Sequence, residues 1–204
     1  MVRNLGVLFD ETMSWVSEIN MLISNGYFKL RQAYSFKNFL SKPSKMLLVQ
    51  SYILSGFNYS GIILQNLYKF QAEKLQRFQN ACVRFILNLR KFDHISEGFK
   101  SLNLLKMDKI RSVQNLTFMH KIVRGEAPAY LCEKINYQGD HHSHVTRARL
   151  NIRISPFRTN YGMNCFFNSI GKEYNNIINT LDLTPLDCNT ATFKNKLKKH
   201  FLES

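Results

Sequence analysis

Glycine, proline and cysteine are scarce in this chain, with 9, 4 and 4 copies among 204 residues. So few glycines and prolines exclude a collagen-like or linker-like chain. The cysteines are widely spaced and form no C-x-x-C pair, which argues against a disulfide framework and a thiolate zinc site. Residues 1–12 contain Asp10 and Glu11 and no apolar run, so we expect no secretory signal and an intracellular protein.

Acidic residues are also scarce, because 14 Asp and Glu stand against 28 Lys and Arg, which gives a formal charge of +14. Residues 21–60 contain five basic side chains and no acidic one. The remaining positive charge is distributed along the rest of the chain. A charge balance of this kind predicts a polyanionic partner, and its distribution suits a long nucleic-acid duplex better than a small anion. With 16 Phe and 9 Tyr, the chain can bury a core and is not disordered.

Long hydrophobic runs are absent except in the uncharged stretch 46–68. Its length is close to the roughly 20 residues that a membrane-spanning helix needs. However, it contains several Ser, Asn and Gln residues, and its centre, SGFNYSG at 55–61, is rich in turn-forming residues. We therefore predict two buried elements joined by a turn, and no membrane partner.

Catalytic motifs are absent: the sequence has no Walker loop, G-x-G-x-x-G, H-E-x-x-H or G-x-S-x-G. The 14 acids form no cluster that would hold hard cations for phosphoryl transfer. The side chains of Asp140, His141, His142 and His144 could ligate a metal, but their spacing fits no common site. We predict a polar loop there, and no catalytic residue, metal or cofactor in this chain. Cys–His catalysis through Cys132 or Cys165 stays open, although no spacing supports it.

Hydrophobic periodicity predicts a mainly α fold. Helices are expected over 15–34, from Pro43 onward, and over 67–87, 107–123, 164–174 and 190–201, with a further helical turn near 128–131. One strand is expected near 146–155, where apolar residues alternate with Arg. A polar interruption that begins at Arg90 suggests two regions, 1–90 and 91–204.

Two basic clusters are candidates for phosphate contact. The first lies among aromatic residues between 27 and 45, and the second lies on one face of the predicted strand and just after it. The alternative is a solvated face that only keeps the protein soluble. The lysines near the end of the last helix are explained by the helix dipole alone. The candidate nucleic-acid-binding residues are Lys29, Arg31, Lys37, Lys42 and Lys45 in the first cluster, and Arg147, Arg149, Arg153 and Arg158 in the second.

Five segments, taken in order, resemble the C-terminal part of reverse transcriptases from non-LTR (LINE-like, jockey and chicken-repeat type) retrotransposons. The segments are NLGVLFDETMSWVSEI, LQRFQNACVRFIL, FMHKIVRGEAPAYL, HSHVTRARLNIRISPFRTNYG and TFKNKLKKHF. The second matches L-Q-x-x-Q-N-x-x-x-R-x-I, and the third matches M-x-K-I-x-x-G-x-A-P-x-Y-L. The chain departs from the family where W-N-x-L-P is usual, since it has Tyr174, Asn175, Asn176 and Ile177 there.

The resemblance implies that residues 1–90 are a helical, thumb-like region and that 91–204 are the post-thumb region. In the family, the palm with its Asp-Asp motif and two magnesium ions lies upstream of these segments. The chain would then be a fragment of an RNA-directed DNA polymerase that binds template–primer duplex, such as an RNA–DNA hybrid, and works with a palm domain. We expect no polymerase activity from it alone, and a nuclear or cytoplasmic ribonucleoprotein location. The alternatives are a basic helical module that binds protein, or a transposon remnant without function.

Overall fold

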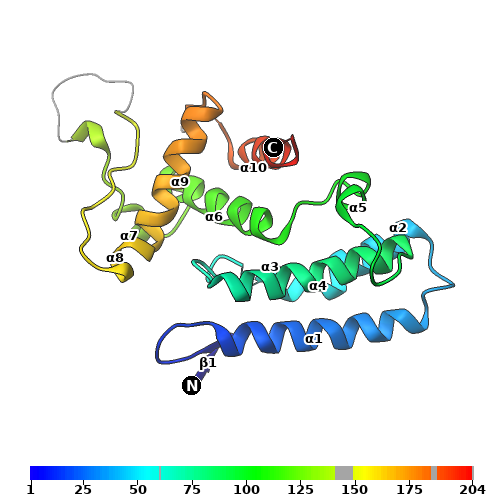
Figure 1. Cartoon of the computed structure of the whole chain (residues 1–204). Coiled ribbons are helices and arrows are strands. Elements are labelled where there is room, and N and C mark those ends of the chain that lie inside the picture. The colour runs from blue at the N-terminus through cyan, green and yellow to red at the C-terminus, as the bar shows by residue number, and fades with distance from the viewer. Residues whose placement is uncertain (60, 141–148, 185–187, 204) are drawn as a thin grey trace. The chain divides into compact units, whose positions relative to one another are not determined.

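The chain is mainly α, as predicted, in a computed structural model that describes residues 1–59, 61–140, 149–184 and 188–203 (Figure 1). Within the described residues it has ten α-helices and one two-stranded sheet. It divides into two compact units, residues 1–111 and 112–204. The boundary falls within helix α6 (Met107–Val123), about twenty residues after the division at 90 that the sequence suggested.

Unit 1 begins with an antiparallel hairpin, β1 (Val2–Asn4) paired with β2 (Val7–Phe9). Leu5 and Gly6 both have positive φ, 46° and 85°, as a two-residue turn that matches the strand twist requires. The following turn is organised by Asp10, whose carboxylate accepts hydrogen bonds from the Ser14 N–H and hydroxyl at 2.7 and 2.6 Å. These bonds lower the pKa of Asp10 and hold the chain at the entrance to the first helix.

The core of unit 1 forms where α1 (Val16–Ser35) packs against α4 (Lys69–Leu87). The two helices lie side by side and run in the same direction (Figure 1). Gly26 allows this close approach, because a Cβ there would lie 2.5 Å from the ring of Phe78. The predicted apolar stripe of α4 is confirmed as buried, and it consists of Leu75, Phe78, Cys82, Phe85 and Ile86. Burial raises the pKa of the Cys82 thiol to about 12, so this side chain stays neutral in the core.

Three short helical segments complete this core: α2 (Lys42–Leu48), the π-helical η1 (Val49–Ile53) and α3 (Ser55–Tyr59). Ser41 caps α2 by accepting a hydrogen bond from the Ser44 N–H. The predicted turn at 55–61 is wrong over residues 55–59, which are helical. They stay helical because the Phe57 side chain is buried and stacks on Phe78, with ring centroids 4.9 Å apart. No helix in the described part of the chain is long and apolar enough to cross a membrane.

Residues 91–111 belong to unit 1 because they fold back onto α4. The side-chain amide of Gln79 donates to the Leu105 carbonyl at 2.8 Å, and Gln76 accepts the Met107 N–H at 3.1 Å. Helix α5 (Ser96–Ser101) places Gly98 against Leu87 of α4. The polar interruption after residue 90 is therefore a turn on the surface of one unit, and the division between units comes later.

Unit 2 is built around the buried imidazole of His120 on α6. Its Nε2 lies 2.8 Å from the Cys188 carbonyl oxygen and its Nδ1 lies 2.8 Å from the Tyr174 hydroxyl. Since a carbonyl only accepts, Nε2 carries the proton and Nδ1 accepts from Tyr174. The ring also stacks on Phe193, at a centroid distance of 4.1 Å. Burial lowers the pKa of His120 and keeps it neutral, so this polar group joins three elements in the core.

Three of the remaining elements of unit 2 were predicted, although the helix expected over 164–174 runs to residue 180; the short elements at 138–140 and 160–164 were not predicted. The remaining elements are α7 (Ala129–Cys132), the 3-10 turn η2 (Gln138–Asp140), α8 (Asn160–Asn164), α9 (Phe166–Thr180) and α10 (Thr190–Glu203). Gly125, with φ of 72°, ends α6 as predicted, and the Glu126 N–H closes the turn onto the Lys121 carbonyl.

The strand predicted near 146–155 is wrong in its described part. Residues 149–151 form a turn and a bend, and Ile152 makes a single isolated bridge to Tyr137. The side chain of Asn175 on α9 explains this, because its amide bonds both the N–H and the carbonyl of Ile152, at 2.9 and 2.8 Å. Three backbone hydrogen bonds of 2.8 to 3.0 Å still join residues 149–153 to residues 136–139, so the segment pairs irregularly with one neighbour while Asn175 satisfies Ile152.

The contact between Gly26 and Phe78 predicts that Gly26→Ala destabilises unit 1. In an open helix this change would add roughly 1 kcal/mol of stability. Here the methyl group would overlap the buried ring, and overpacking costs about 1–3 kcal/mol. Gly56→Ala on α3 is the matched control, because a Cβ there meets only Leu22 at 3.7 Å. Denaturant melts should show a loss for the first variant alone; equal behaviour of the two would contradict this packing.

Candidate nucleic-acid interface

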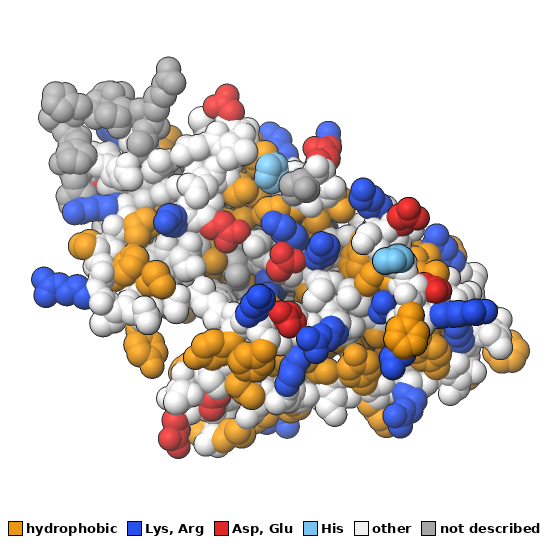
Figure 2. Space-filling view, in the orientation of Figure 1, with side chains coloured by type: hydrophobic (Ala, Val, Ile, Leu, Met, Phe, Trp, Pro, Cys, Tyr) orange, Lys and Arg blue, Asp and Glu red, His pale blue; other side chains and the backbone are white. Residues whose placement is uncertain are grey.

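A basic and aromatic surface covers the exposed side of the α1–α4 pair, and we call it the α1–α4 face. Figure 2 shows basic and hydrophobic side chains interspersed over these two helices. The face consists of Tyr27, Arg31 and Tyr34 from α1, and of Lys74, Arg77 and Arg84 from α4.

Helical spacing and side-chain contacts place these residues together. Residues 27, 31 and 34 are three and four apart on α1, as are residues 74, 77, 81 and 84 on α4, so each set lies on one side of its helix. The Tyr27 ring packs edge-on against Phe78 at 5.0 Å, and Tyr34 packs in the same way against Phe85 at 5.1 Å. The ammonium of Lys74 spans the two helices by donating to the Asn20 side chain at 3.1 Å.

The charge of this face is strongly positive. Helices α1 and α4 together contain six Lys and Arg residues and two acids. Glu18 is buried and accepts the Leu8 N–H at 2.8 Å, so it lies away from the face. Glu73 pairs with Arg77 at 3.2 Å, but both side chains are exposed and such a pair is weak. A polyanion can therefore displace the Glu73 carboxylate from Arg77.

The two tyrosines are well suited to act as hydrogen-bond donors. Tyr27 and Tyr34 are 45% and 44% exposed, so each phenol is half-buried against α4 and half in solvent. Burial raises the pKa of both hydroxyls. The positive charges of Arg77 and Arg84 act in the lowering direction on Tyr27 and Tyr34, but burial has the larger effect. Both hydroxyls therefore stay protonated at neutral pH and can donate to an anionic ligand.

Exposed aromatic rings extend the face at the start of α4. Tyr68 and Phe70 stack with centroids 5.8 Å apart, and the Lys74 ammonium lies 5.9 Å from the Phe70 ring centre. Aromatic platforms beside basic side chains are typical of surfaces that bind nucleic acid.

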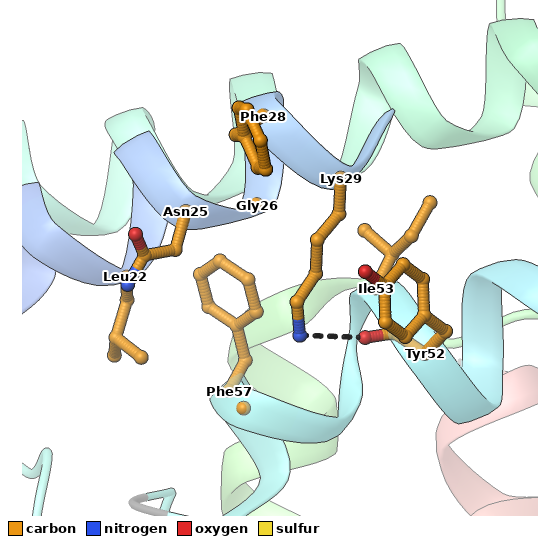
Figure 3. A pocket seen from close by; sticks show the side chains of 9 residues that line it. Leu22, Asn25, Gly26, Phe28, Lys29, Tyr52, Ile53 and Phe57 are labelled. Carbon is orange, nitrogen blue, oxygen red and sulfur yellow. Dashed lines mark hydrogen bonds between the residues drawn. The ribbon is translucent and has the colours of Figure 1, made fainter. Parts of the chain in front are cut away.

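The first sequence-predicted cluster is divided by the structure. Arg31 is exposed on the α1–α4 face, and Lys37 lies beside it, with its ammonium 5.5 Å from the Tyr34 ring centre. Lys29 lies on another side of α1 and donates to the Tyr52 carbonyl at 3.0 Å, across a hollow of about 220 Å³ (Figure 3). Its ammonium fixes α1 to η1.

Lys42 and Lys45 differ sharply, although they are one helical turn apart on α2. Lys42 is exposed, whereas Lys45 is 3% exposed. The Lys45 ammonium donates to the Asn88 side chain at 2.8 Å and lies 5.7 Å from the Phe85 ring centre. Because Asn88 ends α4, Lys45 places a cation at the negative end of that helix. It is part of the core and does not belong to the face.

The second cluster lies in unit 2, away from any regular strand. Arg147 lies outside the described residues. Arg149, Arg153 and Arg158 are exposed, and the Arg149 side chain packs against Gly139. Without a strand, these residues lack the shared face that the sequence predicted.

Sequence reasoning missed Lys74, Arg77 and Arg84 as candidates. Isolated Lys and Arg residues on an amphipathic helix usually belong to an ordinary solvent-exposed face, so they do not by themselves indicate binding. A signal was present in the repeated Arg-Phe pair, Arg77-Phe78 and Arg84-Phe85, in which the Phe is buried each time, while Arg77 is exposed and Arg84 is half-buried.

Several residues that carry the family resemblance have structural roles. Gln76 and Gln79 hold the start of α6, and His120 and Gly125 organise the core and the end of that helix in unit 2. Where the family usually has W-N, Tyr174 bonds His120 and Asn175 bonds Ile152. The departure from the family pattern therefore lies at well-connected positions.

No group of His, Cys, Asp and Glu in the described ranges is placed to hold a metal ion. His141, His142 and His144, which the sequence raised as candidates, lie outside those ranges. Comparisons of the chain with protein-family models, curated proteins and solved structures give no match.

The contrast between Lys42 and Lys45 predicts opposite outcomes for two similar substitutions. Lys45→Ala removes the partner of Asn88 inside the core, and a lost buried charged hydrogen bond costs about 1–3 kcal/mol. Lys42→Ala changes an exposed side chain and should stay within about 0.5 kcal/mol. Urea denaturation measures both. Equal stabilities would show that Lys45 is not part of the core.

Proposed function

We propose that this chain is the thumb-like and post-thumb part of a non-LTR retrotransposon reverse transcriptase, and that unit 1 binds the template–primer duplex. The observation that carries the proposal is the α1–α4 face, on which four bases surround two tyrosines and a weakly paired acid. The order of the five family-like segments supports it independently. The ligand class is an RNA–DNA hybrid or a related duplex.

The chemistry of the face matches a phosphate backbone. Arg forms bidentate, charge-assisted hydrogen bonds with phosphate oxygens, and Tyr hydroxyls donate to the same oxygens. These contacts carry no sequence information, which suits a protein that must hold any template. We propose no catalysis by this chain alone; its contribution is to hold the duplex, because small misplacements of a primer end cost large factors in rate.

Exposed aromatic residues support a second candidate function, a protein-binding module. Phe36 and Phe39, which follow α1, are 61% and 87% exposed, and Leu47 on α2 is exposed as well. Apolar side chains gathered at one surface are typical of protein interfaces. Salt dependence separates the two functions, because contacts with phosphates release counterions whereas apolar contacts do not.

A triple substitution tests the α1–α4 face. Arg31→Gln, Lys74→Gln and Arg77→Gln together should weaken binding of an RNA–DNA hybrid at low salt. The slope of log affinity against log salt should become shallower by about two to three, since each phosphate contact contributes about 0.9. Fluorescence anisotropy over a salt series measures both quantities.

The matched control removes the same charge from unit 2. Lys194, Lys196 and Lys198 are exposed on α10, so Lys194→Gln, Lys196→Gln and Lys198→Gln lower the net charge equally. The control should keep nearly the parental slope. If both triple variants lose affinity to the same extent, binding follows net charge and the α1–α4 face is not the interface. Circular-dichroism melts establish that each variant is folded.

A further inference from the structure

The α1–α4 face repeats itself once along the two helices. A small residue followed by Tyr occurs twice on α1, seven residues apart, and Arg followed by Phe occurs twice on α4, also seven residues apart. The first layer contains Gly26, Tyr27, Arg77 and Phe78, and the second contains Ala33, Tyr34, Arg84 and Phe85.

The aromatic contacts within the two layers are equivalent. In each layer the Tyr ring meets the Phe ring edge-on, at 5.0 Å and 78° in the first and at 5.1 Å and 65° in the second. Both Phe side chains are fully buried, so each Tyr is held against a rigid support. In each layer the Arg lies close enough to influence the neighbouring phenol electrostatically.

One translation relates the layers, because α1 and α4 run in the same direction (Figure 1). Seven residues of α-helix advance about 10.5 Å, at about 1.5 Å per residue. A small anion fits one layer at a time. A ligand that engages both layers must itself carry negative groups at a regular spacing, as a nucleic-acid strand does.

The distance between the two layers also determines how they contact the strand. A strand of a duplex carries one phosphate per nucleotide, so layers about 10.5 Å apart can each meet a different phosphate of the same strand. We propose that the two layers grip one strand of the bound duplex at two different phosphates, each through one Tyr hydroxyl and one Arg guanidinium. This inference rests on the proposed function, which it deepens.

Existing contacts of the two arginines are compatible with this role. Arg77 pairs with the exposed Glu73 at 3.2 Å, and Arg84 donates to the Asp93 carbonyl at 3.4 Å. Each guanidinium has further N–H groups that can donate to a phosphate while these contacts persist. The contacts orient the side chains before the ligand arrives.

Photo-cross-linking measures the spacing directly. The photoreactive analogue p-azidophenylalanine is placed at position 27 or at position 34 of the full chain, where it keeps the aromatic ring. Each protein is irradiated with a short blunt-ended RNA–DNA hybrid, and the linked nucleotides are mapped on both strands. Both positions should label the same strand, with the two distributions offset along it in one direction. The offset persists even if the protein occupies several registers.

Single substitutions provide a second readout. Arg77→Gln and Arg84→Gln should each make the salt slope shallower by about one, whereas Lys100→Gln on the exposed surface of α5 should leave it unchanged. Labelling of opposite strands, coincident distributions, or unchanged slopes in both Arg variants would overturn the two-layer grip while hybrid binding persists. Failure of the unmodified chain to bind the hybrid would instead overturn the proposed function itself.

Discussion

The close packing of α1 against α4 is the constraint on which unit 1 depends. Gly26 has no side chain, so the ring of Phe78 can lie directly against the α1 backbone. That contact fixes the register of the two helices, and the register sets Tyr27 against Phe78 and Tyr34 against Phe85. The apolar core and the basic surface are thus two sides of one helix pair, and a shift of either helix would disturb both.

Buried polar side chains form hydrogen bonds that fix how neighbouring segments are placed, which apolar packing alone does not do. Gln76 and Gln79 bond the backbone at Met107 and Leu105, and the Lys45 ammonium bonds Asn88 at the end of α4. In unit 2, His120 joins Tyr174 to the Cys188 carbonyl. Each of these groups would be costly to bury without its partner, so each one favours a single arrangement of its neighbours.

Much of the helical fold could be predicted from the sequence, because periodicity reports which side of a helix is buried. The bounds of α6 and the buried stripe of α4 follow from it directly. Periodicity could not reveal that Asn175 would satisfy Ile152, since that bond joins residues 23 apart. Nor could it separate the buried Lys45 from the exposed Lys42, because burial depends on which helix end lies nearby. Among the predicted bases that the structure describes, Arg31 alone belongs to the α1–α4 face.

The central claim is that a duplex lies on the α1–α4 face. Backbone amide chemical shifts test this claim most directly when they are recorded from the folded chain during titration with an RNA–DNA hybrid at low salt. The account predicts that the amides that shift gather in residues 20–38 and 70–84, and that they return to their starting positions as salt is added. Shifts confined to the exposed arginines around residues 149–158 or to α10, or no shift at all in the folded protein, would contradict it.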